Sequence, residues 1–357
     1  MRAQPAQPML PCSGAPLISV SQPQPGPLRR KARRKPTAVM ALLAVLADAA
    51  PALAEPPELQ LPLACTLGKD CFIEDYVDAD PGPGQSDYAC GIKSRNGHRG
   101  TNFSLPNFTA METGVAVLAA APGTIAATRD GVEDRAVTAA NRDAIRGREC
   151  GNAVRIDHGD GWQTLYCHLR RGSVTVQKGD VVDTGTPLGL VGLSGLTNYP
   201  SLHMSVLRDG QAVDPFRPDA TAACGITQQG GLWADPPAYD RAGLFTAGFS
   251  DRVPNFAEVK SGAARITATT GNTPLVLYAH VFYAEPGDVL ILSAAGPAGE
   301  VFSTEIPLED PKKQLFRAYG RKAPPGGWDA GNYRGYVRLM RGETLLAVRH
   351  ADIRVKK

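Results

Sequence analysis

Short apolar runs separated by glycine, proline and aspartate turns dominate this sequence, and they restrict the chain to a β-rich fold. The 357 residues include 38 glycines and 30 prolines, a composition that favours frequent turns over long helices. Runs of about four to eight residues bounded by such turns are typical of β-strands. We therefore predict an all-β protein with two sets of strands.

The first set belongs to a predicted β-sheet domain at residues 97–218. Its runs lie at 115–121, 123–128, 153–157, 162–169, 174–176, 187–191 and 202–206. The polar segment 129–149 interrupts these runs, and we interpret it as a surface insertion with a short helix.

The second set predicts a small β-sandwich of the immunoglobulin-like kind at residues 261–357. Its runs lie at 274–284, 288–294, 299–306, 333–340 and 344–349, and short, evenly spaced strands are typical of sandwiches. Residues 219–260 are rich in glycine, proline and aspartate and are interpreted as an extended linker. Residues 55–96 are interpreted as an irregular arm tied by disulfides.

Residues 1–54 are interpreted as a secretory leader. A basic stretch at 29–35 precedes an apolar run at 38–47, which is too short to span a bilayer comfortably. The tripeptide A-L-A at 52–54 fits a cleavage site, so we place the cut after Ala54. An uncleaved leader that anchors the chain is the alternative, and it is the only membrane contact that we expect. The mature protein would be periplasmic or extracellular.

The formal net charge of +3 depends on this leader, which carries seven of the basic residues and one acid. The remainder holds 31 basic and 34 acidic residues, a net charge of −3. A nucleic-acid partner is not expected, because no basic field remains to neutralise phosphates.

Six cysteines follow the leader, an even number that suggests disulfides in an exported protein. Six cysteines allow about fifteen connectivities. We expect Cys65 to pair with Cys71 across a small loop and Cys150 with Cys167 across a hairpin. Elimination then leaves Cys90 with Cys224.

Three histidines near predicted strand ends suggest a metal-dependent hydrolase site: His98, His168 and His203. A hydrolytic zinc ion takes about three ligands from His and Asp or Glu and leaves a position for water. Alternation along a strand predicts that Ser201 and His203 share one face. By the same rule, Tyr166 and His168 should share a face, with Cys167 opposite. We expect His158, His280 and His350 to be structural or surface residues.

These motifs resemble the lysostaphin/LytM-type zinc endopeptidases of the bacterial cell wall. The family has an H-x-x-x-D motif, and this chain has H-R-G-T-N at 98–102 in that place. The family also has an H-x-H motif, and this chain has S-L-H at 201–203. The strand that carries a catalytic histidine in the family is matched by Y-C-H-L at 166–169. The resemblance implies an antiparallel β-sheet domain with a narrow groove that holds zinc. It implies that His98 and His203 are metal ligands and that His168 is catalytic.

Two residues depart from the family pattern. Asn102 stands where the family has its aspartate ligand, and Ser201 stands where it has a second catalytic histidine. A neutral amide removes the anionic ligand, and a serine cannot replace an imidazole as an acid or base near neutral pH. We therefore expect zinc binding to be weak or absent and the hydrolytic activity to be lost.

Three functions remain open from the sequence. The first is a degenerate domain that binds peptidoglycan peptides or a cell-wall hydrolase without cutting. The second is an active zinc endopeptidase that recruits another carboxylate, such as Asp87 or Asp157. The third is a structural envelope module, against which the retention of His98, His168 and His203 argues.

Overall fold

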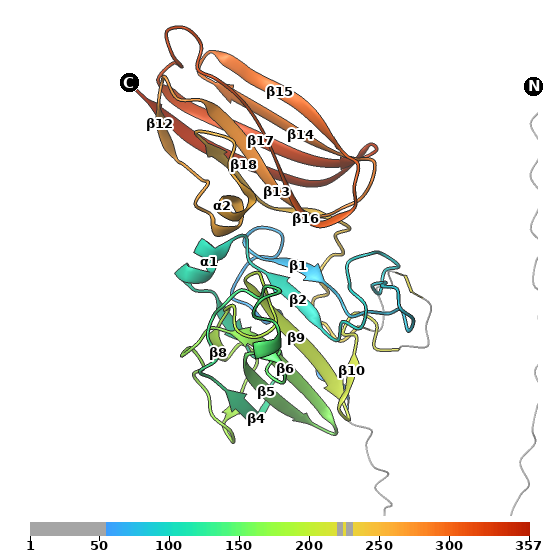
Figure 1. The fold of residues 1–357 in the computed structure, drawn as a ribbon. Coiled ribbons are helices and arrows are strands. Elements are labelled where there is room, and N and C mark those ends of the chain that lie inside the picture. The colour runs from blue at the N-terminus through green and yellow to red at the C-terminus, as the bar shows by residue number, and fades with distance from the viewer. Residues whose placement is uncertain (1–54, 220–223, 226–230) are drawn as a thin grey trace, which may run out of the picture. The chain divides into compact units, whose positions relative to one another are not determined.

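The computed structural model describes residues 55–219, 224–225 and 231–357. Strands far outnumber helices among these residues and nearly all of them pair antiparallel, so the predicted all-β class is confirmed (Figure 1). The leader at 1–54 and its cleavage site lie outside the described residues. Within the described residues, no helix is long and apolar enough to cross a membrane.

The first large sheet has eight strands. They are β1 (Phe72–Asp75), β2 (Thr101–Ser104), β4 (Gly123–Arg129), β5 (Asn152–Gly159), β6 (Trp162–Leu169), β7 (Val181–Val182), β9 (Ser201–Arg208) and β10 (Gln211–Val213). Their spatial order is β1-β2-β9-β6-β5-β4-β7, and β10 pairs with β9. This order puts β2 and β6 on either side of β9, so residues distant in sequence meet on neighbouring strands.

Two further strands and one short helix accompany this sheet. β3 (Ala116–Leu118) pairs with β8 (Pro187–Leu190). The helix α1 (Phe108–Thr113) begins at Asn107, whose side chain accepts a hydrogen bond from the Ala110 amide, and ends at Gly114. Residues 174–176, which were predicted to form a strand, have no strand pairing, and the insertion at 129–149 contains only a short 3-10 turn at Asp143–Ile145.

The C-terminal part is a sandwich of two sheets, as the sequence predicted. One sheet contains β11 (Gly243–Ser250), β13 (Leu275–Ala284) and β16 (Lys312–Arg321). The other contains β12 (Ala268–Thr270), β18 (Thr344–Lys356), β17 (Gly331–Arg341), β14 (Asp288–Gly296) and β15 (Gly299–Leu308). The helix α2 (Phe256–Ser261) starts in a capping box formed by Asn255 and Glu258.

Two segments that were expected to be irregular contribute strands. β11 lies within the expected linker at 219–260 and pairs with β13. Its glycines suggested a loop, but a Cβ at Gly243 would lie 2.3 Å from the Phe282 ring, so the glycine admits an aromatic side chain. The expected irregular arm at 55–96 likewise contains β1, the edge strand of the eight-stranded sheet.

The arm also packs against the sandwich, and both belong to one unit that starts at Leu53. The Phe72 ring centroid lies 5.4 Å from that of Phe245 and 5.7 Å from that of Phe282. Tyr199, which precedes β9, lies 5.4 Å from Phe245 in the same way. These contacts bury apolar surface between the two sheet systems.

Three disulfides form among the described cysteines. Cys65 pairs with Cys71, Cys150 with Cys167 and Cys90 with Cys224, which are the pairs favoured by loop size and elimination. The Cys150–Cys167 bond ties the chain entering β5 to the end of β6.

Candidate functional site

The pairing of β2 with β9 places Asn102 directly opposite His203. Residues opposite each other in antiparallel strands point to the same face of a sheet. Asn102 Oδ1 accordingly lies 2.9 Å from His203 Nδ1, a hydrogen-bonding distance. Two of the residues that the motifs singled out are therefore in direct contact.

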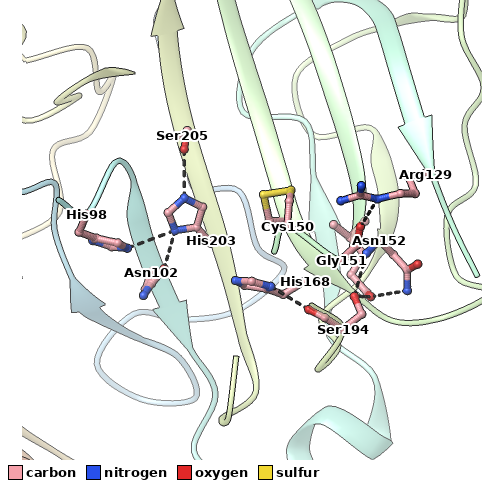
Figure 2. The surroundings of a disulfide bond; sticks show 12 residues. His98, Asn102, Arg129, Cys150, Gly151, Asn152, His168, Ser194, His203 and Ser205 are labelled. Carbon is pink, nitrogen blue, oxygen red and sulfur yellow. Dashed lines mark hydrogen bonds between the residues drawn. A yellow bond between two sulfur atoms is a disulfide. The ribbon is translucent and has the colours of Figure 1, made fainter. Parts of the chain in front are cut away.

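His98 joins this pair from the segment before β2 (Figure 2). Its Nε2 lies 3.2 Å from His203 Nδ1, and its Nδ1 lies 2.7 Å from the Tyr76 carbonyl oxygen. A carbonyl only accepts, so His98 carries its proton on Nδ1 and presents a lone pair on Nε2. His203 then donates from Nδ1 toward His98 and Asn102, while its Nε2 accepts from the Ser205 hydroxyl at 3.0 Å.

His168 reaches the same face through a local irregularity. Cys167 lies opposite His203, so simple alternation along β6 would turn His168 to the other face of the sheet. A register shift between Asn152 and Val154 and a positive φ of 66° at His168 redirect the side chain. Its ring centroid lies 6.0 Å from that of His203.

The expected sharing of a face by Tyr166 and His168 is therefore wrong. Tyr166 lies opposite Met204 and is fully buried, and its hydroxyl accepts a hydrogen bond from the Ala120 amide. The bulge could not be read from the sequence, because Y-C-H-L contains no glycine to mark it.

A buried carboxylate that the sequence analysis missed lies beside Asn102. Asp75, the last residue of β1, accepts a hydrogen bond from Asn102 Nδ2 at 2.6 Å. Two residues of the sandwich also bind it: the Tyr283 hydroxyl donates to Oδ1, and Lys313 Nζ lies 2.7 Å from Oδ2. Asp75 has no exposed surface, so these partners replace the water that its charge requires.

Asp87 and Asp157, the carboxylates proposed as substitutes for the missing ligand, have other roles. Asp87 Oδ1 accepts from the Ala89 and Gly91 amides, and its Oδ2 accepts from the Tyr239 hydroxyl. Asp157 Oδ1 accepts from the Gly159 amide in a turn. The carboxylate in contact with Asn102 is Asp75.

Ser201 faces a cavity beside these residues. Its register position opposite Ser104 puts it two residues from His203 on the same face, and its hydroxyl donates to the Tyr199 carbonyl at 3.3 Å. The cavity measures about 350 Å³. Residues of the sheet, the insertion and the sandwich line it, including Asn102, His168, Ser201, Arg95, Arg142, Glu74, Asn198 and Lys313.

Burial keeps the histidines of the site neutral. Burial lowers the pKa of His168 to about 4, despite the hydrogen bond to the Ser194 carbonyl. Burial, reinforced by the neighbouring imidazoles, holds the pKa of His203 well below its usual value. Burial also lowers the pKa of His98, against the opposing charge of Asp75. At neutral pH these rings present lone pairs and N–H donors, and no positive charge.

Asp75 remains ionised in spite of its burial. Burial raises the pKa of this carboxyl, but the charges of Lys313, of His98 where acid protonates it, and of Arg95 outweigh that effect and hold the pKa well below its ordinary value. The pKa of Lys313 is in turn raised, because the charges of Glu74 and Asp75 outweigh the partial desolvation of a side chain that keeps 41% of its surface exposed. A fixed ion pair therefore lies directly behind Asn102.

The remaining histidines lie outside this cluster. His158 bonds through Nδ1 to the Pro122 carbonyl and through Nε2 to the Thr164 hydroxyl. His280 is buried among aromatic rings in the sandwich, and His350 is exposed on β18.

Comparison with known proteins shows what this region is similar to. Residues 96–215 match the model of peptidase family M23. The peptidoglycan DD-endopeptidase ShyA of Vibrio cholerae is 26% identical over 132 residues, which are 37% of this chain and 25% of that protein. The murein hydrolase activator EnvC of Escherichia coli is 42% identical over 65 residues, 18% of this chain and 15% of that protein.

A solved structure of a zinc-containing peptidase from Vibrio cholerae is 23% identical with a TM-score of 0.26, and the match covers 42% of this chain and 40% of that one. The chain thus spans at most a quarter of the length of the two curated relatives. The family resemblance drawn from the motifs is confirmed for residues 96–215.

Peptidases of this family are zinc enzymes, but the donor set of this chain does not fit a catalytic zinc ion. Two neutral imidazoles and a neutral amide oxygen converge at His98, His203 and Asn102, and the adjacent carboxylate of Asp75 is already bound to Asn102 and Lys313. Catalytic zinc sites in hydrolases commonly include an anionic ligand or a third imidazole.

The distances between possible metal-ligand atoms also argue against a catalytic metal site. Among the described residues, the one group of three His, Cys, Asp or Glu ligand atoms within 4.8 Å of one another is Cys65, Asp70 and Cys71, whose sulfurs form a disulfide. We therefore derive no catalytic step through a metal.

Proposed function

We propose that this protein is an exported, non-catalytic member of the M23 group whose sheet domain binds peptidoglycan peptides in the cell envelope. One observation carries the proposal: the Asn102 side chain donates a hydrogen bond from Nδ2 to Asp75, and its Oδ1 accepts one from His203. The position that would supply an anionic ligand instead holds a neutral amide that is hydrogen-bonded on both sides.

The second departure points the same way. Ser201 places a short hydroxyl, bonded to the Tyr199 carbonyl, where the family has an imidazole. Losing one general acid or base commonly lowers a rate by about 10²–10⁴. His168 retains a lone pair on Nε2, because Nδ1 donates to Ser194, but it lacks a partner imidazole at position 201.

The cavity beside these residues supports a binding role. Its volume of about 350 Å³ lies in the range of about 300–1,000 Å³ that is typical of small-ligand pockets. The named functions of the similar proteins, a peptidoglycan endopeptidase and a murein hydrolase activator, support the cell wall as the setting.

Co-sedimentation with purified, insoluble peptidoglycan tests this proposal. Residues 55–357 should pellet with the polymer, and soluble peptidoglycan peptides should compete for binding. A variant that fills the cavity, Ser201→Trp, should remain in the supernatant. If the wild-type protein does not pellet but binds a purified cell-wall amidase, the domain recognises a hydrolase partner and the proposal is overturned.

A further inference from the structure

We propose that the cavity beside Asn102 binds the C-terminal carboxylate of a peptide, with Arg95 and Arg142 as the cationic contacts. This inference rests on the proposed function and deepens it, because it names the chemical group of the peptide that the domain recognises.

Arg95 and Arg142 come from different segments and line the same cavity. Arg95 lies in the loop before His98, and Arg142 lies in the insertion at 129–149. Neither guanidinium has a hydrogen bond or ion pair within the part of the chain that the structure describes. Arginine forms strong, paired hydrogen bonds with carboxylates, so two unpaired guanidinium groups on one cavity favour an anionic ligand.

The acidic group of the cavity does not neutralise these arginines. Glu74 accepts hydrogen bonds from the Ser104 hydroxyl at 2.6 Å and from Gln314 Nε2 at 2.7 Å. Lys313 Nζ lies 3.5 Å from the same carboxylate and 2.7 Å from Asp75. Ser104 of β2 and two residues of the sandwich thus occupy the Glu74 carboxylate, so neither arginine is paired with it.

Other groups in the cavity suit the rest of a peptide end. His168 donates from Nδ1 to the Ser194 carbonyl, which leaves the Nε2 lone pair as an acceptor for a peptide N–H. The Asn198 side chain also lines the cavity and has no hydrogen bond within the described residues. A terminal carboxylate, together with the amide N–H that precedes it, offers the complementary acceptor and donor.

The size of the cavity favours a peptide end over a folded partner. A volume of about 350 Å³ lies near the lower limit for small-ligand pockets, about 300 Å³, whereas a helix alone is about 10–12 Å wide with its side chains. An acidic helix of a partner protein is therefore treated as an outcome of the test.

The test compares two ligands that differ in one group. Nα-acetyl-D-alanyl-D-alanine with a free carboxylate and its C-terminal carboxamide are titrated into residues 55–357, with binding followed by NMR. The acid should bind at least about tenfold more tightly than the carboxamide, because the carboxamide lacks the charge that strengthens hydrogen bonds from the two guanidinium groups. Arg95→Gln and Arg142→Gln should each remove most of this preference.

Arg146→Gln is the matched control. Arg146 lies in the same insertion, pairs with Asp143 at 3.4 Å and does not line the cavity, so the variant should bind both ligands as the wild-type protein does. Equal binding of acid and carboxamide by the wild-type protein overturns the inference.

Co-sedimentation with peptidoglycan separates this failure from failure of the proposed function. If the polymer still binds while acid and carboxamide do not differ, only the carboxylate site is wrong. If neither the polymer nor the dipeptide binds, both proposals fail. Binding of an acidic partner helix that depends on Arg95 and Arg142, without binding of the dipeptide, also overturns the inference.

Discussion

Asn102 Nδ2 lies 2.6 Å from the Oδ2 of the buried Asp75, so an amide donates to a carboxylate where the family has an aspartate. The replacement at position 102 is therefore matched to its neighbour. An aspartate there would set two carboxylates against each other, whereas the amide supplies the proton that Asp75 accepts.

Asn102→Asp should lower the free energy of unfolding by about 2–4 kcal/mol at neutral pH, because an additional carboxylate would be buried without compensation. The introduced carboxyl would have a raised pKa in the folded state, so the difference from wild type should narrow as the pH falls. Urea denaturation at several pH values measures this. Asn332→Asp, at an exposed position on β17, should have little effect.

An exchange variant separates this interaction from other effects. Asp75→Asn combined with Asn102→Asp restores one amide and one carboxylate across the pair. The loss of unfolding free energy in this double variant should be smaller than the sum of the losses in the two single variants. Strict additivity would show that the two side chains do not interact.

Lys313→Met should destabilise the protein by about 1–3 kcal/mol, because it removes the cation that compensates Asp75 while Asn102 and Tyr283 remain bound. The pKa of Asp75 is lowered in the folded state, so the stability it contributes is present above about pH 4 and is lost as the pH falls. The gap between wild type and variant should therefore shrink in acid.

The neighbouring Lys312 provides the control for this prediction. It is half exposed and lies 4.0 Å from the exposed Asp310, a pair that contributes little. Lys312→Met should leave the urea midpoint nearly unchanged. An equal effect of the two substitutions would contradict the role given to Lys313.

His280→Phe should preserve or raise stability at neutral pH. Among the described residues, neither ring nitrogen of this fully buried histidine has a partner at hydrogen-bonding distance and angle, and Phe245, Phe256 and Tyr199 surround it. Burial lowers the pKa of His280 to about 3. When the pKa of a histidine is lowered in the folded state, its titration leaves the free energy of unfolding unchanged above about pH 6.5. Below that pH the unfolded chain takes up a proton that the folded protein does not, so the free energy of unfolding decreases as the pH falls toward the folded pKa.

The variant should accordingly lose less stability than the wild-type protein between about pH 6.5 and pH 4. Thermal melts across this range measure the difference. His350→Phe, at an exposed position, is the control and should leave the melting temperature at neutral pH nearly unchanged. A steeper acid loss in His280→Phe than in wild type would refute the assignment.

The disulfides should differ in their contribution to stability. Chain entropy predicts that a bond closing a longer loop stabilises more, by about 3 kcal/mol for fifteen residues. Replacing Cys90 and Cys224, which are separated by 134 residues, by alanine should cost more than replacing Cys65 and Cys71, separated by 6. Denaturant midpoints of the two double variants measure this, and the reverse order would contradict it.

The sequence was sufficient for the family, the all-β class and the meeting of His98, Asn102 and His203. Ordered motifs and strand alternation carried those predictions. It was not sufficient for Asp75, because C-F-I-E-D gives no sign that its last residue pairs with a strand 27 positions later. Contacts of this kind depend on sheet register, which short strands specify weakly.

The contribution of the sandwich was missed for a related reason. β16 begins K-K-Q-L-F-R, a charged sequence without clear alternation, so no strand was predicted there. Lys313 and Gln314 nevertheless reach Asp75 and Glu74 across more than 200 positions. Only the packing of the sandwich against the arm brings them to the site.

Release of soluble peptides from purified peptidoglycan, with zinc added, tests the central claim most directly. The wild-type residues 55–357 should release none, even where they bind the polymer. The triple change Asp75→Asn, Asn102→Asp and Ser201→His supplies the missing carboxylate and imidazole and is the informative comparison. If the wild-type protein releases soluble peptides and a chelator abolishes this release, the protein is an active metallopeptidase and the account is contradicted.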